Sequence, residues 1–299
     1  MKISRCALFG AAAGVVHGIP LMKRQVNNDA TILNYALTLE HLEATFYQQG
    51  LQNYSHEAFL SAGFPDPFYS NLQQVASDEQ THVQFLTSAL GAAGAPAVAQ
   101  CNYTFPATDP KSFISLANVL EGVGVSAYLG AAASITNKTY LTAAGSILAV
   151  EARHNAYLRA AQGQVPFAQP FDNPLDLNEV FTVASPFITS CPSTNPALPV
   201  KAFPSLTMTP TGNVMNGSTA TLVAGPGLNS TSSSNLSAAF ITVTGPVWAP
   251  LKSLGNSQFV ATIPNGVEGQ SYIVLTSSMS GVSDDNIVAG PAIVEVSPT

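Results

Sequence analysis

One short motif occurs twice in the sequence, and its spacing restricts the fold more than any other feature. Glu79 and His82 are three residues apart, and so are Glu151 and His154. In a helix of 3.6 residues per turn, side chains three apart lie on one face. Each pair therefore predicts a helix that offers a carboxylate and an imidazole to the same metal ion.

Each of these pairs follows a second motif, a glutamate with a tyrosine seven residues later. Glu40 precedes Tyr47, and Glu121 precedes Tyr128. Seven residues make almost two helical turns, so glutamate and tyrosine again share a face. The chain therefore contains an internal repeat of a two-helix unit. This predicts a four-helix bundle with four glutamates and two histidines converging inside it.

The composition favours buried positions for these acidic residues. Only 9% of the chain is charged, and the four glutamates lie among Leu, Val, Ala and Tyr. A buried carboxylate needs a partner or a cation, so the pattern indicates a metal site rather than a solvated helix face. One Glu-x-x-His alone is weak evidence, because chance produces it on solvated helices, whereas four motifs in matching order are much stronger.

Glu43 lies one turn after Glu40 and is an alternative ligand. The repeat favours Glu40, because the position equivalent to Glu43 in the second half is Gly124. Glu43 is then expected behind the ligands as an acceptor, or as an additional ligand. For the two tyrosines we favour core packing with a satisfied hydroxyl over hydrogen bonds to ligand carboxylates or oxidation during turnover.

Capping and stop signals predict four long helices, over 28–49 with Gly50 as the stop, 67–90, 110–136 and 138–162. A short fifth helix is expected over 175–188, a loop over 61–70, and a long crossover over 91–110. The glycines at 122, 124 and 130 suggest close contacts between helices. Arg153 and Arg159 are expected on the outer face without a special role.

The segments LEHLEATFY, DEQTHVQFL and LEGVGVSAYLGAA resemble the ferritin-like superfamily, in particular secreted fungal proteins related to plant desiccation-related and fungal stress-response or sexual-development proteins. The resemblance covers roughly residues 29–190. It implies a dinuclear site for two Fe or Mn ions, with six ligands: Glu40, Glu79, His82, Glu121, Glu151 and His154.

The resemblance implies a first function, and a rival hypothesis comes from a different class of protein. The site would consume oxygen or peroxide, or bind metal protectively, during stress or development. The alternative is a non-catalytic structural glycoprotein of the cell wall or extracellular matrix, in which a metal-free bundle is a scaffold. The oligomeric state cannot be read from the sequence.

The first 24 residues read as a secretory signal peptide and a short propeptide that ends at the dibasic Lys23-Arg24. Cleavage near residue 18 or 20 is the alternative. Without residues 1–24, six basic residues remain against 17 acidic ones, a net charge of −11. An acidic protein of this kind is not expected to bind nucleic acid or a membrane surface, and we expect it to be extracellular or in the cell wall.

Secretion also bears on the cysteines and on six glycosylation sequons. Cys101 and Cys191 are expected to form a disulfide that ties a loop to the chain leaving the bundle. The sequons predict N-linked sugars on exposed loops, at Asn53, Asn102, Asn137, Asn216, Asn229 and Asn235.

The composition changes in the last third of the chain. Short alternating apolar runs separated by Pro, Ser, Thr, Gly and Asn predict an antiparallel β-sandwich over 205–299, joined by a linker over 193–204 to the bundle of residues 25–192. The predicted class is an α+β multidomain protein. The sandwich offers no catalytic cluster, and we expect it to be a stabilising appendage, with contact to wall material, matrix or another copy as the alternative. Trp248 marks either a sugar-binding surface or core.

Overall fold

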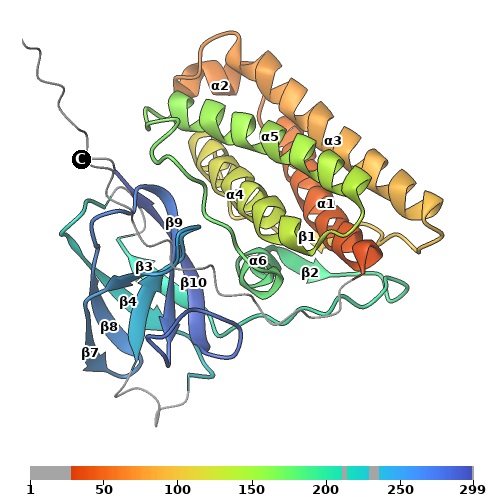
Figure 1. The fold of residues 1–299 in the computed structure, drawn as a ribbon. Helices are drawn as coiled ribbons and strands as arrows, with labels where there is room; N and C mark the ends of the chain where they lie inside the picture. The colour runs from red at the N-terminus through yellow and green to blue at the C-terminus, as the bar shows by residue number, and fades with distance from the viewer. Residues whose placement is uncertain (1–27, 211–213, 229–235, 298–299) are drawn as a thin grey trace, which may run out of the picture.

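A computed structural model describes residues 28–210, 214–228 and 236–297, and it shows a helical bundle followed by two antiparallel sheets (Figure 1). The expected fold class is therefore confirmed. The predicted signal peptide and propeptide lie outside the described residues. The bundle consists of α1 (Asp29–Asn53), α3 (Phe68–Ala92), α4 (Pro110–Ala131) and α5 (Lys138–Ala161). Helix α1 packs closely along α3, and α4 along α5.

The predicted starts of three of the four long helices are confirmed by their side-chain caps. The side chain of Asn28 accepts a hydrogen bond from the Thr31 backbone at the start of α1, and Asp109 and Asn137 cap α4 and α5 in the same way. The predicted end of α1 at Gln49 is wrong. A Cβ on Gly50 would lie 2.0 Å from the Phe113 ring, so this glycine permits the approach of α4 and the helix continues for another turn.

A short helix, α2 (His56–Ala62), was not expected, and its end overlaps the predicted loop. Seven residues are too few to show a helical period in the sequence. Its cap signals are nevertheless present, since Ser55 accepts from the Ala58 backbone and Gly63 ends the helix with φ +96°.

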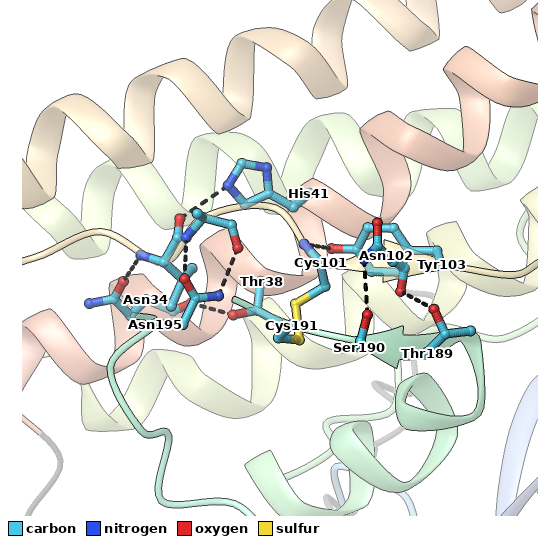
Figure 2. The surroundings of a disulfide bond; sticks show 12 residues. Asn34, Thr38, His41, Cys101, Asn102, Tyr103, Thr189, Ser190, Cys191 and Asn195 are labelled. Atoms are coloured by element: carbon cyan, nitrogen blue, oxygen red, sulfur yellow. Dashed lines mark hydrogen bonds between the residues drawn. A yellow bond between two sulfur atoms is a disulfide. The ribbon is translucent and has the colours of Figure 1, made fainter. Parts of the chain in front are cut away.

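The crossover between α3 and α4 contains β1 (Asn102–Tyr103), which pairs with β2 (Ile188–Ser190). The expected disulfide between Cys101 and Cys191 joins the crossover to the chain beside β2 (Figure 2). The side chain of Asn34 on α1 also holds the crossover, because it donates to Pro96 O at 2.9 Å and accepts from Val98 N at 2.8 Å.

After α5 the chain forms α6 (Leu177–Ala184) and a 3₁₀ turn, η2 (Ser185–Phe187), where the fifth helix was expected. Another 3₁₀ turn, η1 (Ala132–Ser134), replaces the last part of the predicted third helix. Helix α6 contacts both α4 and strand β10, so it lies between the bundle and the sheets (Figure 1).

Two four-stranded antiparallel sheets form the last third. One has the order β10-β9-β5-β6 and the other β3-β4-β8-β7. Side chains on their inner faces form one shared apolar core, so the two sheets pack face to face. The strands are β3 (Leu206–Thr209), β4 (Thr219–Ala224), β5 (Ser237–Phe240), β6 (Val247–Ala249), β7 (Leu251–Gly255), β8 (Gln258–Thr262), β9 (Gly269–Thr276) and β10 (Ile287–Val296). Trp248 is half-buried and packs against a separate, smaller apolar cluster of Ala239, Val274 and Ile287.

Strands β9 and β10 are hydrogen-bonded to the bundle through side chains. The hydroxyl of Tyr272 donates to Gly122 O on α4 at 2.9 Å, and Gln270 Nε2 donates to Val119 O at 3.0 Å. Arg159 of α5 is 3% exposed and makes a bidentate ion pair with Glu295 of β10. The expectation that Arg159 has no special role is wrong, because the sheets cover that face of α5.

The glycines of α4 serve different contacts. A Cβ on Gly122 would meet the Gln270 side chain of β9 at 2.4 Å, and one on Gly130 would meet Leu175 O, before α6, at 1.8 Å. A Cβ on Gly124 would meet Glu151 of α5 at 2.6 Å. The expected contact between long helices is therefore correct for Gly124 and wrong for the other two.

Four of the six predicted glycosylation sites fall on described residues. Asn53, Asn102 and Asn137 are exposed, at the end of α1, in β1 and at the cap of α5, rather than all in loops. Asn216 is half-buried, and its amide nitrogen can donate to Pro264 O at 2.8 Å. Asn229 and Asn235 lie outside the described residues, and glycosylation stays a prediction.

Among the described residues, one helical segment, Pro110–Ser134, is long and apolar enough to cross a membrane. Its mean hydropathy is 1.3, and 72% of its apolar window is buried against the rest of the protein. Its apolar side chains are thus used in the core of the bundle.

Candidate metal centre

All six predicted ligand side chains meet in the middle of the bundle. Each of its four helices contributes: Glu40 comes from α1, Glu79 and His82 from α3, Glu121 from α4, and Glu151 and His154 from α5. The four glutamates are 0% exposed, and the two histidines are 8% and 7% exposed. A cluster of four carboxylates without solvent requires positive charge beside it.

The first half of the centre surrounds His82. Its Nδ1 lies 3.2 Å from Glu40 Oε2, 3.2 Å from Glu79 Oε2 and 3.4 Å from Glu151 Oε1. One ligand atom from each of these four residues lies within 4.8 Å of the others. Four such atoms can surround a single ion.

The second half surrounds His154. Its Nδ1 lies 3.0 Å from Glu79 Oε1 and 3.3 Å from Glu121 Oε2. These three residues form a second group with ligand atoms within 4.8 Å of one another. Glu79 belongs to both groups through its two oxygens, which is the arrangement of a carboxylate that bridges two ions.

The polar atoms at the centre fit metal ions better than they fit each other. Five of them have no hydrogen-bond partner although they are buried: Glu79 Oε1, Glu121 Oε2, both oxygens of Glu151, and His154 Nδ1. Some lie 3.0–3.4 Å from a neighbouring nitrogen, but without the alignment of a hydrogen bond. Ligands at ~2.1 Å from one ion and at right angles are ~3 Å apart, so the spacing suits a common ion.

Two buried tyrosines hold ligand carboxylates across the bundle. Tyr47 on α1 donates to Glu121 Oε1 on α4 at 2.5 Å, and Tyr128 on α4 donates to Glu40 Oε1 on α1. Burial and the nearby carboxylates raise the pKa of both phenols well above the ordinary value, so both remain donors. Both rings pack in the core as expected, but the preference for packing over hydrogen bonds to ligand carboxylates is wrong, because both hydroxyls donate to ligands.

The surroundings of the centre favour the protonated forms of its two histidines and of Glu151. Burial lowers the pKa of His82, but its contacts with Glu151, Glu40 and Glu79 outweigh burial and raise that pKa to about 12. Contacts with Glu121 and Glu79 likewise raise the pKa of His154 to about 11, against the effect of its burial. Burial and neighbouring carboxylates raise the pKa of Glu151 well above its usual range. Metal ions must replace these protons to bind.

One contact at the centre was not predicted from the sequence. Asp78 Oδ2 lies 3.2 Å from His154 Nε2, so Asp78 fixes the ring while Nδ1 faces the carboxylates. Asp78 directly precedes Glu79, whereas Val150 precedes Glu151 in the second half of the repeat. Comparing the two halves shows the difference, but only the structure shows its partner.

Glu43 is buried but stands outside both groups of ligand atoms. Its Oε1 would lie 3.1 Å from a Cβ on Gly124, which places it beside Glu151. Burial and the charges of Glu151, Glu79 and Glu40 raise its pKa well above the usual range. Glu43 is thus beside the ligands rather than among them, and its role as an acceptor stays a prediction.

The four-helix bundle and its six ligand side chains are the features by which this part of the chain can be compared with known protein families. Residues 28–164 match the family model described as "Ferritin-like domain", and this part of the chain is a ferritin-like domain. The chain is also similar to Protein rds1 of Schizosaccharomyces pombe (strain 972 / ATCC 24843), with 27% identity over 178 residues. The match covers 60% of this chain and 44% of that protein, so the chain spans less than half of its relative's length.

Proposed function

We propose that the chain is an exported protein whose bundle binds two iron or manganese ions and consumes oxygen or peroxide with them, in stress protection or development. The observation that carries the proposal is the group of five buried ligand atoms without hydrogen-bond partners. Two divalent ions bring four positive charges to four carboxylates, and oxygen with imidazole ligands suits iron and manganese. When bound in the divalent state, such a pair supplies one electron per ion, which together with two protons reduces dioxygen to hydrogen peroxide or hydrogen peroxide to two water molecules.

The protein's own residues would prepare the centre for this chemistry. Tyr47 and Tyr128 each hold one carboxylate by a single oxygen, so the other oxygen of that carboxylate would be available to bind an ion. Asp78 orients His154. The apolar side chains around the centre exclude bulk water and strengthen the electrostatic attraction between ions and carboxylates.

Metal content tests the proposal. Purified wild-type protein, reconstituted with Fe²⁺ or Mn²⁺ without oxygen, should hold about two ions per chain by elemental analysis. The double variant Glu79→Ala with Glu151→Ala should lose both ions, because it removes the bridging carboxylate and a ligand of the first group. Glu57→Ala, an exposed glutamate on α2, is the matched control and should bind like wild type.

The reaction is tested on the same samples, by following oxygen uptake and peroxide loss. Wild-type protein without any ion after reconstitution would contradict the proposal and support the metal-free scaffold of a structural glycoprotein. Export is supported by the disulfide, which persists in oxidising compartments. It is tested by sequencing the amino terminus of the protein collected from the medium, which should start at Gln25.

A further inference from the structure

An apolar cavity of about 60 Å³ lies beside the centre, between α1, α4, α6 with its 3₁₀ turn, and β10. Glu43 is the one polar side chain in its wall, and the others are apolar. Leu42, Val123 and Ala184 are buried wall residues from three different helices. About 10–15 Å³ is enough for one water molecule, so this cavity has room for a small molecule to move.

The cavity reaches the metal centre at one place. Gly124 and Glu43 belong to its wall, and both also lie against the ligand cluster. A Cβ on Gly124 would stand 2.6 Å from Glu151 Oε2, so the glycine leaves α4 without a side chain between the cavity and that carboxylate. A molecule at this end of the cavity would lie next to the ions.

The cavity lies close to solvent on its other side. Val119, Val183, Phe187 and Ile293 are half-buried wall residues. Rotamers of exposed side chains change within nanoseconds, and we expect such changes at these half-buried positions to admit a diatomic molecule. Ile293 belongs to β10, so the sheet domain supplies part of the wall.

We propose that this cavity binds dioxygen and delivers it to the metal centre between Gly124 and Glu43. The inference rests on the proposed function and names dioxygen rather than peroxide as its oxidant. Hydrogen peroxide would lose its hydrogen bonds to water on entering, and an apolar wall would leave its hydroxyl groups unpaired. Dioxygen has no such hydrogen bonds to lose, and an apolar wall suits it.

Binding is tested without metal, with xenon as an apolar probe of cavities. Crystals of the metal-free protein under xenon pressure should show xenon between Ala184 and Gly124. Ala184→Leu adds three carbon atoms to the wall and should abolish that site. Ala144→Leu makes the same change in a second apolar cavity, of about 20 Å³ near Tyr128, and should leave the xenon site intact. Wild-type crystals without xenon in the larger cavity would overturn the proposal.

Delivery is tested with the Fe²⁺-loaded protein by stopped-flow oxidation. Ala184→Leu should slow oxidation by dioxygen several-fold and leave oxidation by hydrogen peroxide unchanged, while Ala144→Leu changes neither rate. Val183→Leu, a smaller change in the same wall, replaces Ala184→Leu if that variant fails to fold or to bind two ions. Unchanged dioxygen rates, or equal losses with both oxidants, would overturn delivery through the cavity.

These experiments distinguish a failure of the proposed function from a failure of the cavity's role. A wild-type centre that binds ions but reacts with neither oxidant overturns the proposed function and delivery together, while the xenon result still decides whether the cavity binds apolar molecules. A centre that reacts with dioxygen equally fast in all variants leaves the proposed function standing and overturns the role of the cavity.

Discussion

The Tyr47 hydroxyl on α1 donates a 2.5 Å hydrogen bond to Glu121 on α4, the glutamate of the other half of the repeat. Tyr128 on α4 does the same for Glu40 on α1. The tyrosine of each half of the repeat thus donates a hydrogen bond to the glutamate of the opposite half, and not to the glutamate of its own half. The duplicated motif therefore depends on the pairing of α1 with α4.

Replacing Tyr47 or Tyr128 by phenylalanine should weaken metal binding about 10–100-fold, the usual effect of removing a hydrogen bond behind a ligand. The ring and its packing remain, so the fold should be kept. Competition with a coloured chelator measures the affinity. Tyr54→Phe is the matched control. Its hydroxyl donates to Ala107 O rather than to a carboxylate, and Tyr54 belongs to neither group of candidate ligands. Equal affinities in all three variants would show that the tyrosines only pack.

Asp78 makes the two halves of the centre unequal, because Val150 occupies its equivalent position. Asp78→Val copies the second half into the first and frees the ring of His154. We expect one ion to bind about tenfold more weakly and the other to bind as before, seen as a separated second step in calorimetric titration. Gln74→Ala removes the other partner of Asp78, at 2.8 Å, and should have little effect. A uniform loss at both steps would contradict an effect local to His154.

The sequence was sufficient to predict the centre because the repeat supplies an internal comparison. Two copies of Glu-x6-Tyr and Glu-x-x-His identified the helices and the side chains that the structure brings together. Ligands spread over 115 positions, from Glu40 to His154, can be identified in this way only when they have helical spacing and the motif occurs twice. Asp78 has no second copy, so the same comparison could not identify its role.

Contacts between distant segments were harder to predict from a single sequence. Gly50 resembles a helix stop, but the Phe113 ring packs against its bare Cα. Arg159 has the spacing of an outer-face residue, and the sheet domain, 136 residues later at Glu295, makes it buried. Local periodicity shows which face of a helix is outside its bundle, but not what a second domain places there.

The pKa values of the centre predict how pH acts on the metal-free protein. The folded pKa values of His82 and His154, about 12 and about 11, exceed the ordinary 6.5. Their contribution to stability is complete below pH 6.5 and is lost as the pH rises toward those values. The raised pKa values of Glu43, Glu121 and Glu151 act in the same direction, because the unfolded carboxyls release protons that the folded ones keep.

The melting temperature of the metal-free protein should therefore fall by several degrees from pH 6 to pH 9, as calorimetry can show. Bound ions displace the protons, so the difference between loaded and metal-free protein should grow over the same range. His82→Gln with His154→Gln should reduce the slope of the metal-free protein. A metal-free melting temperature that rises with pH between 6 and 9 would contradict this description of the centre.

The ion pair between Arg159 and Glu295 joins the bundle to the sheets, so we expect it to contribute to cooperative unfolding of the two domains. The Arg159 side chain is 4% exposed and that of Glu295 is 14% exposed, so removal of one partner leaves the other poorly solvated. Arg159→Met should cost about 3–5 kcal/mol, whereas adding Glu295→Leu should restore much of the loss. Arg153→Met, an exposed arginine on the same helix, should change stability little.

Urea unfolding can follow each domain separately in these variants. The single tryptophan, Trp248, lies in β6 and reports the sheets, while far-UV circular dichroism reports mainly the helices. In wild type the two signals should change together, because Arg159, Gln270 and Tyr272 join β9 and β10 to the bundle. In Arg159→Met we expect the two midpoints to separate. Coincident midpoints with an unchanged free energy of unfolding would show that the other contacts couple the domains without this pair.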